Sequence, residues 1–168
     1  MNRFARILQH RWLDETDTRR ALDEAALARI EQRIAASERG HGGEIRVCVE
    51  AGLPLSYLWR GATARERALM MFGKLRVWDT DANNGVLSYL LLAEHAIEIV
   101  ADRGLARHVP AGHWQAIVQG MRDEFRARRF EPGLLRAVDA VEALLLQHFG
   151  LSDSAPNVNE LPDAPHLM

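Results

Sequence analysis

The stretch 77–105 most constrains the fold, because it contains two short apolar runs separated by two polar residues. Both runs are rich in leucine and β-branched residues. Runs of this length, joined by a short polar connection, are typical of a β-hairpin. We therefore predict antiparallel strands over residues 85–93 and 96–101, with the turn at Glu94 and His95.

A hairpin folds the chain back on itself, so its two open ends lie side by side. Counting back from the turn places Leu87 opposite Asp102, which brings Asp102 beside the polar loop that precedes the first strand. That loop carries Asp79, Asp81 and Asn84. Carboxylate and amide oxygens are the ligands that Ca²⁺ and Mg²⁺ prefer. The hairpin therefore predicts an oxygen-rich pocket at its open end.

The rest of the sequence predicts one further strand and several helices. The alternating residues 44–50 predict the strand, and apolar residues at helical spacing predict the helices. The expected helices cover about 18–39, 63–75, 110–126 and 132–149. This order predicts an α/β fold in which a small mixed β-sheet with a central hairpin is flanked by helices, an αβα sandwich. If the strand 44–50 is parallel to the first hairpin strand, Glu44 begins at the same edge and joins the pocket.

Three segments are expected along the chain. Residues 1–17 form an amphipathic segment that we expect to pack on its own domain, with peripheral association with a membrane surface as the alternative. Residues 18–149 form the domain. Residues 150–168 contain three prolines and no periodic pattern, which indicates an extended or disordered tail that Leu161 and Leu167 could dock on the domain.

Composition limits the class of protein. A chain of 168 residues with 48% hydrophobic residues is typical of one compact domain. A formal net charge of −2 provides no electrostatic reason to expect nucleic acid. The one cysteine, Cys48, excludes an internal disulfide, and its apolar surroundings predict a buried thiol. Neither a membrane span nor the apolar core of a secretory signal is recognisable, so we expect a cytoplasmic protein.

Known loop motifs do not settle the chemistry of the polar loop. Its start at Asp79 is similar to an EF-hand calcium loop, but Asn84 replaces the required glycine and Leu90 the required glutamate, so a full EF-hand is excluded. The D-x-D motif of haloacid dehalogenase phosphatases follows an apolar strand, whereas Gly-Lys-Leu-Arg precedes this one. Two interpretations stay open: a solvated loop whose side chains cap their own backbone, and a Ca²⁺ or Mg²⁺ site.

The segment NNGVLSYLLLAEHAIEIVADRGL resembles the core of the TPM domain family, which has N-G-V-L, a long apolar run and a strand that ends in D-x-G. The likeness extends over roughly residues 26–149. By position, Asn84, Asp102 and Gly104 match the family motif, and Glu44 matches a glutamate of the first strand. The resemblance implies an α/β sandwich, calcium or magnesium binding in some members, and acid phosphatase activity in a plant thylakoid branch.

Two function classes therefore stay open. The first is a divalent-metal-binding domain that acts as a protein-interaction or assembly module. The second is a metal-assisted acid phosphatase that acts on phosphomonoesters. Many relatives carry a signal peptide and a C-terminal membrane helix, and the chain resembles the free-standing bacterial branch that has neither. The sequence names neither the protein partner nor the oligomeric state.

Overall fold

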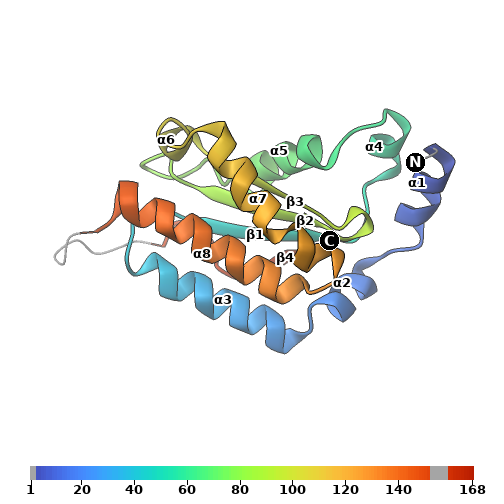
Figure 1. The fold of residues 1–168 in the computed structure, drawn as a ribbon, viewed down its shortest axis with the longest axis horizontal. Helices are drawn as coiled ribbons and strands as arrows, with labels where there is room; N and C mark the ends of the chain where they lie inside the picture. Colours follow the sequence, from blue (N-terminus) through green and yellow to red (C-terminus); the bar gives the residue numbers. More distant parts are fainter. Residues whose placement is uncertain (1–2, 152–158) are drawn as a thin grey trace.

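A computed structural model describes residues 3–151 and 159–168 of the chain (Figure 1). Its centre is a four-stranded mixed sheet in the order β3–β2–β1–β4. The strands are β1 (Ile45–Glu50), β2 (Val86–Leu91), β3 (Ala96–Ala101) and β4 (His166–Leu167). β1 is parallel to β2 and β4, whereas β2 and β3 are antiparallel. The predicted α/β fold with a small mixed sheet is confirmed, and its hairpin, β2–β3, includes the edge strand β3.

Helices surround the sheet in the described part of the chain (Figure 1). They are α1 (Arg3–Arg11), α2 (Glu15–Ala21), α3 (Glu24–Glu38), α4 (Leu55–Trp59), α5 (Ala64–Lys74), α6 (Arg103–Ala106), α7 (Ala111–Arg126) and α8 (Phe130–Phe149), with a 3₁₀ turn, η1 (Leu92–Glu94), inside the hairpin. None of these helices is long and apolar enough to cross a membrane.

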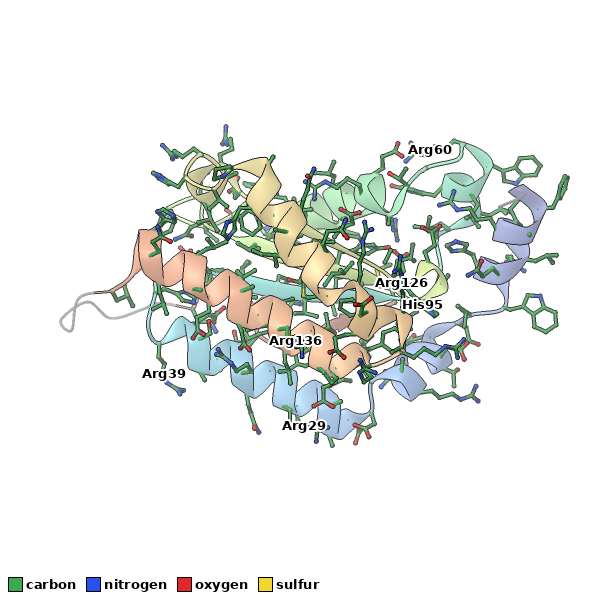
Figure 2. The ribbon with its side chains drawn as sticks, in the orientation of Figure 1. Arg29, Arg39, Arg60, His95, Arg126 and Arg136 are labelled. Atoms are coloured by element: carbon green, nitrogen blue, oxygen red, sulfur yellow. The ribbon has the colours of Figure 1, made fainter. Side chains whose placement is uncertain are left out.

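The sheet has a hydrophobic core on each face, and Figure 2 shows the side chains that fill the space against the helices. Ile45, Val47 and Val49 of β1 pack on one face with α3, α7 and α8. Cys48 and Leu87 belong to the other core, which α4 and α5 cover. The alternation of β1 thus fills both layers of the sandwich. Burial raises the pKa of the Cys48 thiol to about 12, as expected for an unreactive cysteine.

The hairpin turn differs from the prediction by two residues. β2 ends at Leu91, because residues 92–94 form the 3₁₀ turn and His95 adopts a left-handed conformation with φ of 47°. Leu91 therefore pairs with Ala96, and Leu87 pairs with Val100 rather than with Asp102. In this register Asp102 lies one residue beyond the last paired residue of β3, Ala101, and beside Gly85 at the start of β2.

The ends of the chain contact the sheet and its turn. Residues 166–167 pair with β1, and Leu161 is buried. In α7, the Phe125 side chain is fully buried. Trp114 and Ile117, by contrast, are only half-buried. Residues 152–158 of the expected tail lie outside the described residues.

Candidate functional site

Backbone hydrogen bonds hold Asp102 against the polar loop. The Asp102 N–H donates to the Gly85 carbonyl at 2.9 Å, and the Gly104 N–H donates to the Asn83 carbonyl at 2.7 Å. A Cβ atom on Gly104 would lie 2.4 Å from that same Asn83 oxygen, so only glycine allows this approach. The two segments that the sequence predicted to be neighbours are therefore in contact.

Asp102 and Asn84 each bury an oxygen without a hydrogen-bond partner. The Asp102 Oδ1 accepts the Arg103 N–H at 2.6 Å and caps α6. The Asn84 amide nitrogen donates to the Gly42 carbonyl at 2.7 Å. Of the three buried side-chain atoms that lack a partner among the described residues, two are Asp102 Oδ2 and Asn84 Oδ1. Each such oxygen costs roughly 1–3 kcal/mol, or more when charged, so a ligand would be favourable here.

Glu44 points to the C-terminal segment. Its Oε1 accepts the Glu160 N–H at 3.1 Å and its Oε2 accepts the Leu161 N–H at 3.2 Å. Burial raises the pKa of Glu44, and these two bonds oppose the rise. Glu44 thus fastens residues 159–168 to the start of β1, although sequence reasoning placed it in the pocket.

The two loop aspartates face solvent. Asp79 and Asp81 are exposed, while Thr80 is buried and its hydroxyl accepts the Asn84 N–H at 3.1 Å. The Asp81 N–H donates to the Glu160 carboxylate at 3.2 Å. Within residues 3–151 and 159–168, no three His, Cys, Asp or Glu side chains are placed to hold a metal ion together. The structure brings the backbone of Asp102 and Gly104 against Gly85 and Asn83, and it leaves Asp79 and Asp81 exposed.

A further buried carboxyl, Glu38, was missed by the sequence reasoning. It is 5% exposed and its Oε1 accepts the Ile45 N–H at 3.0 Å. Burial raises the pKa of Glu38 to about 8, and the nearby carboxylates of Glu44 and Asp163 add to the rise. A weak signal was present, because an acid in the last turn of a helix opposes the helix dipole. At neutral pH Glu38 holds its proton.

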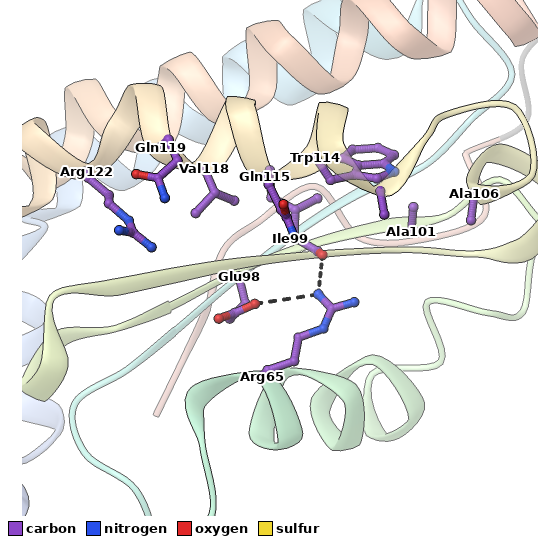
Figure 3. A pocket seen from close by; sticks show the side chains of 11 residues that line it. Arg65, Glu98, Ile99, Ala101, Ala106, Trp114, Gln115, Val118, Gln119 and Arg122 are labelled. Carbon is purple, nitrogen blue, oxygen red and sulfur yellow. Dashed lines mark hydrogen bonds and ion pairs between the residues drawn. The ribbon is translucent and has the colours of Figure 1, made fainter.

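A groove of about 490 Å³ follows the free edge of β3, between α5 and α7 (Figure 3). From α5, Arg65 reaches across the edge and donates to the Ile99 carbonyl, and its guanidinium lies 3.6 Å from the Glu98 carboxylate. Trp114 and Arg122 line the opposite wall. Bonding of an arginine to an outward-facing carbonyl protects an edge strand from pairing with other chains.

Comparison with solved structures identifies the fold. The protein BA42 from the psychrophilic bacterium Bizionia argentinensis matches with a TM-score of 0.74 and 23% identity, over 86% of this chain and 94% of that one. The N-terminal domain of a P. gingivalis protein matches with a TM-score of 0.62 and 23% identity, over 78% of this chain and 82% of that one. No curated protein matches the sequence significantly.

The family model of the TPM domain matches residues 16–144, well over half of the chain. The matched range includes the hairpin, Asn84 and Asp102, on which the resemblance was based. It also includes β1 and α3, and it ends inside α8. The chain therefore belongs to the TPM domain family.

Proposed function

We propose that the chain is a divalent-cation-binding domain in which Asp102 and Asn84 supply the first oxygen ligands to Ca²⁺ or Mg²⁺. The observation that carries the proposal is the pair of buried, unpartnered oxygens, Asp102 Oδ2 and Asn84 Oδ1. Asp102 is 7% exposed and Asn84 is 1% exposed, so water cannot solvate them as it solvates a surface loop. A hard cation would offset the cost of burying both atoms.

The remaining ligands would come from the rim and from water. Asp79 and Asp81 are the acidic residues of the loop that also contains Asn84, and both are exposed. Mg²⁺ commonly keeps several waters and takes only one or two carboxylates from the protein. Two protein oxygens can therefore form part of a Mg²⁺ site that water completes. Glu44 would join only by releasing the Glu160 and Leu161 N–H groups.

The cation would order the polar loop against the start of α6, and the ordered surface would serve as a module for a protein partner. Asn83 and Gly104 already make the backbone contact on which this ordering depends. A cation at this place would contribute positive charge next to the buried Asp102 carboxylate and so offset the cost of burying it. The proposed role is thus assembly rather than chemistry on a substrate.

Calorimetric titration and thermal unfolding test the proposal with Asp102→Asn. Asparagine still caps a helix, so the variant should fold, but it lacks the charge that attracts the cation. Wild type should bind Ca²⁺ or Mg²⁺ and gain melting temperature through linkage, and Asp102→Asn should lose most of that gain. The matched control is Asp23→Asn, because Asp23 is also the N-cap aspartate of a helix, α3, and its carboxylate accepts the Ala26 N–H at 2.7 Å. Equal gains in wild type and Asp102→Asn would refute the assignment.

The same samples test the alternative, a metal-assisted phosphatase. Such an enzyme needs an open metal position and a group that prepares water for attack. Hydrolysis of p-nitrophenyl phosphate is measured with each cation for wild type, Asp102→Asn and Asp23→Asn. Metal binding without hydrolysis supports the module, whereas hydrolysis that only Asp102→Asn loses would replace it with the enzyme.

A further inference from the structure

Helix α1 is attached to the domain through its polar side. The Arg6 guanidinium donates to the Glu94 carboxylate at 2.7 Å, and Gln9 donates to a backbone carbonyl of the hairpin turn. The Leu53 N–H donates to His10 Nδ1 at 2.9 Å, so His10 Nε2 carries the proton and donates to Glu94 at 3.1 Å. His10 is only 3% exposed. Ile7 also packs against the core that α4 and α5 cover, so α1 is held by hydrogen bonds together with one apolar contact.

The outward side of α1 is apolar. Phe4, Leu8 and Trp12 recur every four residues, and their exposed fractions are 73%, 59% and 82%. Helix α4 contacts α1 and adds Leu55 and Trp59, which are 46% and 59% exposed. These five residues, here called the α1–α4 surface, are five of the eight large hydrophobic residues that are exposed in the described chain. The exposed apolar area is therefore concentrated in one place.

This orientation reverses the usual rule for a surface helix, which turns its apolar side to the core and its polar side to water. The five side chains keep about half or more of their surface exposed in the described domain. Contiguous exposed apolar surface on a protein marks a place where another surface binds. The hydrogen bonds to Glu94 hold α1 in the orientation that exposes it.

Exposed arginines flank the α1–α4 surface, and the exposed acids Asp14 and Glu15 follow it in the chain. Residues 1–13 contain three arginines and no acidic residue. Arg11 is exposed, and Arg60 follows α4 and lies over the Tyr57 ring at 4.3 Å. Figure 2 shows Arg60 at the end of the molecule where α1 and α4 lie. Apolar and aromatic side chains beside arginines are the composition of helices that lie in the interface of an anionic bilayer.

We propose that the α1–α4 surface docks on the surface of an anionic lipid membrane, with Phe4, Leu8 and Trp12 entering the headgroup region. A second copy of the chain fits less well, because a two-fold contact would place the Arg11 and Arg60 side chains of both copies together. The surface lies at the opposite end of the molecule from α6, whose N-cap residue is Asp102 (Figure 1). The inference is therefore independent of the proposed cation site.

Vesicle co-sedimentation tests the proposal with the full chain. Mixed phosphatidylcholine–phosphatidylglycerol vesicles should bind the protein, and pure phosphatidylcholine vesicles should bind it at least about tenfold more weakly, because the anionic lipid attracts the arginines. Leu8→Ser/Trp12→Ser should lose about tenfold or more of the binding. Both residues are exposed, so the variant should keep its melting temperature. The matched control, Leu69→Ser/Trp78→Ser, removes the same two side-chain types from other exposed positions and should bind like wild type.

A charge-reversal pair separates the electrostatic part. Arg11→Glu/Arg60→Glu should reduce binding to the mixed vesicles, whereas Arg39→Glu/Arg107→Glu, at exposed positions away from α1, should not. Light scattering without lipid follows the mass of each variant. Equal binding by wild type and Leu8→Ser/Trp12→Ser would overturn the proposal. So would a wild-type dimer that this variant dissociates, which would assign the surface to a second copy.

Discussion

Replacing Glu38 with glutamine should change how the stability of the domain depends on pH. Burial raises the pKa of Glu38 from 4.5 to about 8. The folded protein therefore binds a proton on Glu38 at pH values where the unfolded chain has released it. Between about pH 4.5 and about pH 8 the free energy of unfolding should fall as pH rises, because the folded state binds more protons.

The upper bound of this effect follows from the shift itself. A rise from 4.5 to about 8 corresponds to about 5 kcal/mol, at about 1.4 kcal/mol for each pKa unit. The raised pKa of Glu44 acts in the same direction, so the variant should keep part of the dependence. Glutamine preserves an oxygen that can accept the Ile45 N–H and cannot ionise. Its folded state should thus resemble wild type with Glu38 protonated.

Urea unfolding at about pH 5, about pH 7 and about pH 8.5 measures the effect. Wild type should lose several kcal/mol across this range, and Glu38→Gln should lose clearly less. The control is Glu31→Gln on the same helix, since Glu31 is exposed and the change of charge is the same. Parallel slopes for wild type and Glu38→Gln would refute the argument, because they would mean that Glu38 ionises alike in both states.

Three further substitutions test the packing. Phe125→Ala should cost about 3–5 kcal/mol in urea unfolding, because the ring is fully buried between α7, α8 and the sheet. Arg67→Met should cost about 3–5 kcal/mol, since it leaves the buried Glu50 carboxylate, which Arg67 Nε contacts at 2.8 Å, without its cation. Gly104→Ala should lower the melting temperature and any metal-dependent gain, because its Cβ would overlap the Asn83 carbonyl.

The hairpin could be predicted because its information is local. Two apolar runs with a polar turn at Glu94 and His95 require only neighbouring residues to identify, and the register followed within two positions. The error arose at the turn, where residues 92–94 leave the strand. Leu92 and Ala93 are apolar and buried, like the strand residues before them. Hydrophobicity alone therefore did not distinguish the end of the strand from a 3₁₀ turn.

The candidate site was predictable only where its partners are close in the hairpin. Asp102 meets Gly85, and Gly104 meets Asn83, because the two strands between them pair. Glu44, by contrast, is held by Glu160, which is 116 residues away, and no local pattern indicates that contact. A two-residue strand such as β4 also has too few residues to produce a periodic signal, so its pairing with β1 depends on the tertiary fold.

Helix α1 shows what an amphipathic pattern leaves undetermined. The pattern says which residues share a face, but not which face turns inward. Residues 1–17 were expected to pack on their own domain, and within them α1 contacts α4 and places Ile7 against the core. The half-buried Glu94 carboxylate, at the hairpin turn, accepts hydrogen bonds from Arg6 and His10, and Phe4 and Trp12 are turned outward. Because Glu94 binds the polar face, the apolar face is left available to a second surface, for which an anionic membrane has the complementary chemistry.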